Sequence, residues 1–311
     1  MIYPQELMNL PRYLQPTIRI SPCHSDSFQE ILQLPDRDHS TLPSMDPKFW
    51  LDQAVALQVL RSGRSALRLA LLACGLTTTD SVAIITTTGG KYVSSCVTGE
   101  IERICCWSHK IEFNTKVALI IHEFGMPCPI PADLRERGLI IIEDCAYAVG
   151  TRIEGGQVGM VGDFALYSLP KYYPFPYGGI LAARKSLEPS LVAHDLPTEG
   201  AIRIVGKCLT YAETRYEDWN RRRRANWDYF SVHCEKRGCR AFFNLDTGIV
   251  PGAFVSTLRD QTKGASIKDA CVNAGIESTE YYGLGGFYFP VHQLLTEFER
   301  SYVLHHFFRL D

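Results

Sequence analysis

The sequence predicts an α/β protein built on a doubly wound, mostly parallel sheet. Short apolar runs recur up to residue 183, with helical or loop segments between them: 82–85, 117–121, 139–142, 164–167 and 180–183. Each run is apolar throughout instead of alternating with polar residues, which is typical of strands that helices cover on both faces. Ligands of such sheets bind at the carboxyl ends of the strands, so the residues after each run are the candidates for chemistry.

The remaining pattern divides the chain into three regions. Residues 1–45 carry repeated prolines and weak periodicity, which predicts an irregular N-terminal arm. Residues 46–185 hold the predicted strands and form a large domain. Residues 186–311, with longer charged stretches, are predicted to form a smaller C-terminal α+β domain.

Two segments predict helices. Between Leu51 and Cys74, leucines recur at helical spacing on either side of Ser62 and Gly63, which predicts two helices joined by a turn. The all-arginine run 221–224 predicts either a solvated helix face or an anion-binding site.

The bulk composition narrows the class of partner. The 311 residues are 46% hydrophobic and 21% charged, as in ordinary globular proteins. The 32 basic residues nearly balance the 34 acidic ones, so we expect neither nucleic acid nor a membrane surface as partner. Eleven cysteines, an odd number, suggest no disulfide framework, and no signal-like or membrane-spanning segment stands out, so we expect a cytoplasmic protein.

Asp144 and Lys171 are the first two candidates for chemistry. Asp144 comes at the end of the segment 139–144, after the apolar run 139–142 and Glu143. A carboxylate in such apolar surroundings needs a cation or a protonated donor beside it to stay charged. A helix cap would explain it as well. Lys171 follows the strand 164–167 in an aromatic, proline-containing loop, so we expect burial to lower its pKa and free its amine to attack an aldehyde. The alternative is a surface lysine.

A third candidate is the small-residue turn of Gly63, Arg64 and Ser65, which opens a strong helix. Backbone N–H groups and the helix dipole favour a phosphate there, and Arg64 could add a fork of donors. A plain capping turn explains the same residues. We predict no metal site, because His122 and Glu123 lack a second histidine at the zinc spacing and no C-x-x-C pair occurs.

Taken in order along the chain, these segments resemble the DegT/DnrJ/EryC1 family of sugar aminotransferases, which depend on pyridoxal 5'-phosphate (PLP). The matching segments are GRSAL at 63–67, IHEFGMP at 121–127, IEDCA at 142–146, GMVGDF at 159–164 and YSLPK at 167–171, followed by glycines at 178 and 179. The resemblance implies the PLP fold type I and a homodimer.

The resemblance also implies roles for single residues. Lys171 would form the Schiff base with PLP and shuttle protons, and Asp144 would keep the pyridine nitrogen protonated. Ser168 and the turn 63–65 would hold the phosphate, and Tyr92 would stack on the ring. Tyr147 would lie near the cofactor, where the family usually has glutamine or histidine.

The implied activity is amino transfer from an amino acid, glutamate by expectation, to a keto sugar on a nucleotide. Two alternatives stay open. One is a PLP-dependent sugar dehydratase or another lyase. The sugar dehydratases have another residue in place of the Schiff-base lysine, whereas this chain has Lys171 at that position, which weighs against this alternative. A catalytically silent structural or regulatory relative is the other, favoured by Tyr147, by Tyr177 before the paired glycines and by the short region beyond residue 185.

Overall fold

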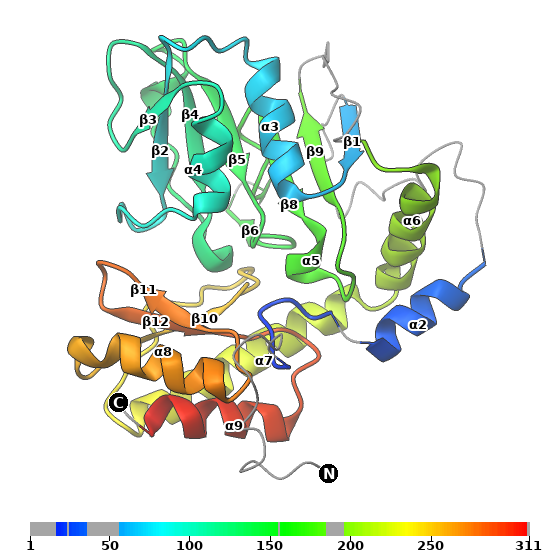
Figure 1. Cartoon of the computed structure of the whole chain (residues 1–311), viewed down its shortest axis with the longest axis vertical. Coiled ribbons are helices and arrows are strands. Elements are labelled where there is room, and N and C mark those ends of the chain that lie inside the picture. The colour runs from blue at the N-terminus through cyan, green and yellow to red at the C-terminus, as the bar shows by residue number, and fades with distance from the viewer. Residues whose placement is uncertain (1–16, 24, 36–55, 155, 185–195, 310–311) are drawn as a thin grey trace.

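The computed structural model describes residues 17–23, 25–35, 56–154, 156–184 and 196–309. Its upper part in Figure 1 is a seven-stranded sheet of order β1-β9-β8-β5-β4-β2-β3. The strands are β1 (Ala56–Leu60), β2 (Ser81–Thr86), β3 (Cys106–Ser108), β4 (Thr115–Ile121), β5 (Ile140–Asp144), β8 (Phe164–Ser168) and β9 (Gly179–Ala183). Neighbours from β3 to β8 are parallel, and β9 is antiparallel to both β8 and β1. The predicted mostly parallel α/β sheet is confirmed.

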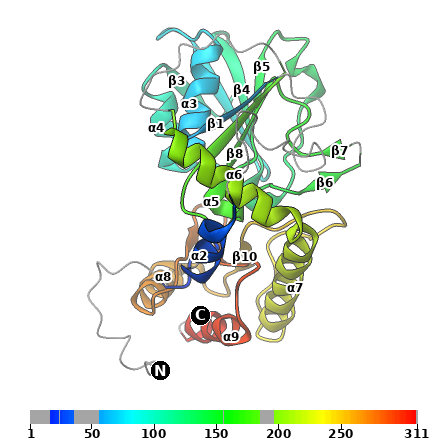
Figure 2. The ribbon, with the colours of Figure 1, turned by 90° about the vertical axis from the view of Figure 1, so that its right-hand side faces the viewer.

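Helices cover both faces of this sheet. One face packs against α3 (Gly63–Ala73) and α4 (Ser95–Ile101), and the other packs against α6 (Glu199–Glu213), which Figure 2 shows crossing the sheet. Successive residues of β9 serve the two faces: Ile180 packs with the α6 side and Leu181 with the α3 side. Because both faces are buried, these strands are apolar at every position.

The prediction of two helices between Leu51 and Cys74 is half wrong. The second helix is α3, but Leu57 and Leu60 belong to strand β1, which pairs with β9 from Ala56↔Ala183 to Leu60↔Gly179. A short apolar run does not distinguish strand from helix by periodicity alone. The backbone hydrogen bonds offered by β9, more than a hundred residues away, decide the matter. Residues 51–55 lie outside the described residues.

The C-terminal part carries a second, antiparallel sheet of order β10-β12-β11. Its elements are β10 (Phe254–Thr257), β11 (Thr279–Tyr281), β12 (Gly286–Phe289), α7 (Tyr216–Glu235), α8 (Gly264–Asn273) and α9 (Glu297–Phe308). Phe230, Phe254, Phe289 and Phe307 form the centre of its core. The predicted domain boundary at residue 185 falls in 185–195, outside the described residues, and stays a prediction.

The described part of the N-terminal arm joins the two sheets. Ile18 bridges Ile276 of the C-terminal part, and the Ser21 hydroxyl donates to the Pro170 carbonyl beside the larger sheet. The arm is not irregular throughout, because it contains α2 (Ser25–Gln33), which packs on α6. The Tyr211 hydroxyl of α6 donates to Glu30 Oε2 at 2.6 Å.

The arginine run 221–224 lies in α7, and it matches neither of its two predicted roles as a whole. Arg221 and Arg222 are exposed and pair with Asp218 one turn earlier, as on a solvated face. Arg223 is only 1% exposed, because it shares a helix face with buried Trp219 and Trp227, four residues to either side.

Smaller elements complete the chain. They are the hairpin of β6 (Arg152–Ile153) and β7 (Gly156–Gln157), the short helix α5 (Leu169–Tyr172), and the 3-10 turns η1 (Glu123–Gly125), η2 (Ala132–Leu134) and η4 (Gln261–Lys263). All eleven cysteines fall within the described residues and are free thiols. In the same residues, no helix is both long and apolar enough to cross a membrane.

Candidate active site

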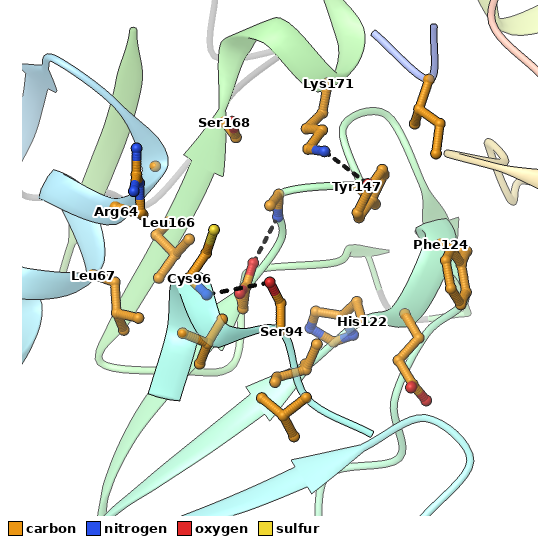
Figure 3. Close-up of a pocket in the computed structure, with 18 of the residues that line it drawn as sticks. Arg64, Leu67, Ser94, Cys96, His122, Phe124, Tyr147, Leu166, Ser168 and Lys171 are labelled. Carbon is orange, nitrogen blue, oxygen red and sulfur yellow. Dashed lines mark hydrogen bonds between the residues drawn. The ribbon is translucent and has the colours of Figure 1, made fainter. Parts of the chain in front are cut away.

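A cavity of about 420 Å³ lies at the carboxyl ends of β4, β5 and β8, facing the C-terminal sheet (Figure 3). It brings together nearly all of the residues that the sequence analysis selected. These are Gly63, Arg64, Tyr92, Asp144, Tyr147, Ser168 and Lys171. Ser65 is the exception: it is buried, and its hydroxyl lies 3.2 Å from the Ser62 hydroxyl in the cap of α3. Tyr92 lines the cavity while its ring contacts those of Tyr281 and Tyr282.

Lys171 lies in α5, the single helical turn that follows β8, and its side chain points toward Tyr147 (Figure 3). The Nζ atom donates a hydrogen bond to the Tyr147 hydroxyl at 2.8 Å and lies 4.7 Å from the centre of that ring. The phenolic oxygen of Tyr147 raises the pKa of Lys171 by more than burial lowers it. The predicted lowering of this pKa is therefore wrong, because the loop supplies a partner for the ammonium as well as a dry environment.

The position of Tyr147 is fixed by close packing. Its ring lies 5.9 Å from that of Phe124, and a side-chain carbon at Gly252 would come within 2.6 Å of the ring. Glycine at 252 therefore makes room for Tyr147. Phe124 and Gly252 thus hold the Tyr147 ring beside Lys171. Because the ring has little freedom to lose, forming the hydrogen bond to Lys171 costs little conformational entropy.

Asp144 is the last residue of β5 and is 7% exposed. Its Oδ1 accepts a hydrogen bond from the Ala146 amide at 2.9 Å, and no other donor to this carboxyl lies among the described residues. Burial raises its pKa, against the smaller lowering by that amide, His122 and Lys171. A turn rather than a helix follows it, so the helix-cap alternative is excluded. The carboxyl lines the cavity with capacity for a further donor.

A buried hydrogen-bond network lies next to Asp144. His122 Nδ1 accepts from the Cys128 amide at 2.9 Å, so the ring proton sits on Nε2 and is donated to Glu143 at 3.1 Å. Glu143 also accepts from the amides of the turn 159–162. Burial alone raises the pKa of Glu143, but His122 and these amides lower it overall.

His122, Glu143 and Cys145 place possible metal-ligand atoms within 4.8 Å of one another. Both ring nitrogens of His122 and both oxygens of Glu143 already take part in hydrogen bonds, so we assign this trio to the supporting network.

The start of α3 is pressed against the end of β8. Ser62 caps the helix, because its hydroxyl oxygen accepts a hydrogen bond from the Ser65 amide at 3.2 Å. The turn is therefore a capping turn, which does not exclude a phosphate site at the same helix start. A side-chain carbon at Gly179 would lie 2.3 Å from the Ser62 backbone, and one at Gly63 would lie 3.0 Å from Ser168. Gly179 is needed for this approach, and Gly63 leaves little room for a larger residue beside Ser168. The first amides of the helix thus remain directed at the cavity beside Ser168.

Several cavity residues escaped the sequence analysis. Ser94 caps α4 and Cys96 lies in its first turn. Tyr288 and Glu277 come from the C-terminal part, and Ile20 comes from the arm. Glu277 Oε2 accepts from the Ile20 amide at 2.9 Å, so arm and C-terminal part meet at the cavity.

The central part of the chain is similar to a known protein family. Residues 106–179 match the model of the DegT/DnrJ/EryC1/StrS aminotransferase family. The chain is related to this family, as its motifs predicted. Over 123 residues it is 35% identical to GDP-perosamine synthase of Vibrio cholerae, which covers 34% of this chain and 34% of that protein. The similarity thus spans about a third of the length of this relative.

Solved structures confirm the fold over most of the chain. The aminotransferase TlmJ from Streptoalloteichus hindustanus superimposes with a TM-score of 0.69 at 16% identity, covering 93% of this chain and 97% of that one. Spr1654 from Streptococcus pneumoniae in its PLP-form gives a TM-score of 0.67 at 14% identity, covering 96% and 97%. The predicted PLP fold type I is therefore correct.

Proposed function

We propose that this protein is a PLP-dependent aminotransferase that moves an amino group from an amino acid, with glutamate as the expected donor, to a keto sugar carried on a nucleotide. One observation carries the proposal: a single cavity holds an amine, a buried acid with room for a further donor, and a helix start. These are Lys171, Asp144 and the turn at Gly63 and Arg64. The name of the perosamine synthase relative supports a nucleotide-sugar substrate.

The residues present fit this cofactor. Asp144 is buried with one described donor, so the N–H of a pyridinium ring would satisfy it and keep it ionised. The start of α3 offers amides to a phosphate, and Gly63 and Gly179 keep that site open next to Ser168. PLP, when bound, supplies the electron sink for the reaction.

The protein's own groups bind, orient and move protons. Lys171 would hold the cofactor through its amine and would carry a proton at Nζ during the reaction. Tyr147 orients that amine through its hydroxyl and favours the charged form, so Lys171 must release a proton before it can act as a nucleophile. Asp144 binds the ring, Ser168 and Arg64 bind the phosphate, and Tyr92 covers one side of the cavity.

Reductive trapping tests the proposal. Purified protein is incubated with PLP, reduced with borohydride and digested, and the pyridoxyl group is located by mass spectrometry. We expect it on Lys171, with Lys171→Ala as the negative control. A label on Lys91 would overturn both the residue assignment and the alignment behind it. Addition of glutamate to the unreduced complex, followed in the visible spectrum, then separates an aminotransferase from a silent relative, whose spectrum would not change.

Further parts of the proposal rest on less direct support. Free thiols at all eleven cysteines are compatible with a cytoplasmic location. The homodimer follows from the family resemblance. We retain the division into the arm 1–45, a large domain at 46–185 and a small domain at 186–311.

A further inference from the structure

Arg223 is a guanidinium buried in the contact between α7 and the lysine-bearing turn. Its Nε donates to Gln293 Oε1 at 2.7 Å, and its Nη1 donates to the Pro251 carbonyl at 3.2 Å. Its Nη2 donates to the carbonyls of Lys171 and Tyr172 at 3.1 and 3.3 Å. Every nitrogen of the fork is therefore used, and two of its acceptors belong to the turn that carries Lys171.

Gln293 completes the same arrangement. While its Oε1 accepts from Arg223, its Nε2 donates to the Tyr172 carbonyl at 2.9 Å. The two side chains come from α7 and from the segment before α9, and they hold one another as well as the turn. We call Arg223 and Gln293 the clamp.

Packing alone does not explain the burial of this charge, although the guanidinium also lies over the Tyr172 ring, 4.8 Å from its centre. Within the described residues Arg223 has no carboxylate partner, and burial lowers its pKa to about 10. Its acceptors are neutral carbonyl oxygens, and Trp219 and Trp227 on the same helix face show that large apolar side chains pack at this surface. An unpaired buried charge destabilises a fold unless its hydrogen bonds are complete, so its retention points to a geometric role.

Lys171 is held at both ends. Its backbone carbonyl is bound by Arg223, and its side-chain amine is bound by Tyr147 at 2.8 Å. The turn that contains it has only four residues, Leu169–Tyr172, and has little internal support of its own. The external contacts therefore set the direction in which the lysine side chain leaves the backbone.

We propose that Arg223 and Gln293 are positioning residues that fix the turn at Lys171, so that its amine meets the Tyr147 hydroxyl within the cavity. The catalytic meaning of this geometry rests on the proposed aminotransferase function. The geometry itself can be tested in the protein without cofactor.

The decisive variant is Arg223→Lys. It keeps a positive charge, but one ammonium cannot reach four acceptors that a planar guanidinium spans. The pKa of Lys171 is measured in the cofactor-free protein by acetylation at a series of pH values, with the Lys171 peptide quantified by mass spectrometry. Because loss of the Tyr147 contact removes a charge-assisted hydrogen bond, we expect the Lys171 pKa to fall by about one unit.

Arg222→Lys is the matched control, since Arg222 is exposed and pairs with Asp218 on the far side of the helix. It should leave the Lys171 pKa unchanged. Gln293→Met provides a second test if Arg223→Lys fails to fold, because it removes the amide while keeping the chain length, and it should produce the same fall.

An unchanged Lys171 pKa in either folded clamp variant overturns the proposal, because a merely structural role would lower the unfolding temperature and leave this pKa where it was. The outcome is separable from the proposed function. If the wild-type protein does not bind PLP but the pKa falls as expected, the clamp stands and the aminotransferase proposal fails.

Discussion

The hydrogen bond between Lys171 and Tyr147 gives the sharpest prediction. Tyr147→Phe removes the hydroxyl that accepts from Nζ at 2.8 Å but keeps the ring, whose centre lies 4.7 Å from the same atom. A hydrogen bond to a charged group contributes about 1.5–3 kcal/mol, and Lys171 is only half-buried, so solvent screening favours the lower end. About 1.4 kcal/mol corresponds to one pKa unit, so we expect the Lys171 pKa to fall by about one unit in Tyr147→Phe.

The direction of the Lys171 pKa shift predicts how the free energy of unfolding depends on pH. In the folded wild-type protein the pKa of Lys171 is raised from 10.5, so the contact stabilises the fold fully below about pH 10.5. That contribution is lost as the pH rises through the folded pKa. The difference in unfolding free energy between wild type and Tyr147→Phe, measured in urea, should be about 1 kcal/mol near pH 8 and should shrink above pH 10.5.

Acetylation of the cofactor-free protein over a pH series reads the Lys171 pKa directly. Below both pKa values the free-amine fraction, and hence the rate of labelling, should be about tenfold higher in the variant. Tyr177→Phe serves as the control, because Tyr177 packs against Phe175 away from the amine. A Lys171 pKa that stays the same or rises in folded Tyr147→Phe would refute the reasoning.

Three further predictions concern the cofactor site. Asp144→Asn should reduce amino transfer by orders of magnitude, because an amide cannot hold a pyridinium proton, and near-normal turnover would remove Asp144 from the role. Because burial raises the Asp144 pKa, folding is opposed at pH values above the pKa of the unfolded carboxyl, so the same change should stabilise the cofactor-free protein near pH 7. Arg64→Ala should weaken PLP by about 1.5–3 kcal/mol and the sugar nucleotide less, which separate titrations of the two ligands decide. Gly179→Ala should lower both the unfolding temperature and PLP affinity, because the new carbon would lie 2.3 Å from the Ser62 backbone; wild-type values for both would show that the turn yields without cost.

The raised pKa of Lys171 changes how the site is understood. Sequence alone suggested a dry lysine with a ready free amine, whereas the structure gives a lysine whose charge is stabilised by Tyr147. A partner that is itself a phenol does not bind the ammonium as firmly as a carboxylate would. The Tyr147 hydroxyl therefore orients the Lys171 amine without forming an ion pair with a carboxylate.

The sequence by itself determined the five inner strands of the larger sheet and the two candidate residues at or after strand ends. Runs such as 117–121 and 180–183 are apolar at every position, which is typical of strands covered on both faces, and their recurrence between helical or loop segments favours a parallel sheet. Asp144 and Lys171 could be selected because one ends such a strand and the other lies in the turn after one, so their place in the fold depends on local order along the chain.

Only the tertiary structure decided the features that depend on distant partners. Leu57 and Leu60 became strand residues because β9 supplies their hydrogen-bonding edge, and Arg223 was separated from its exposed neighbours by the rotation of α7 toward the lysine turn. The direction of the Lys171 pKa shift depended on the Tyr147 hydroxyl. In each case the two interacting residues are close in space but far apart in the sequence. The local sequence pattern around one of them contains no information about which distant residue it will contact.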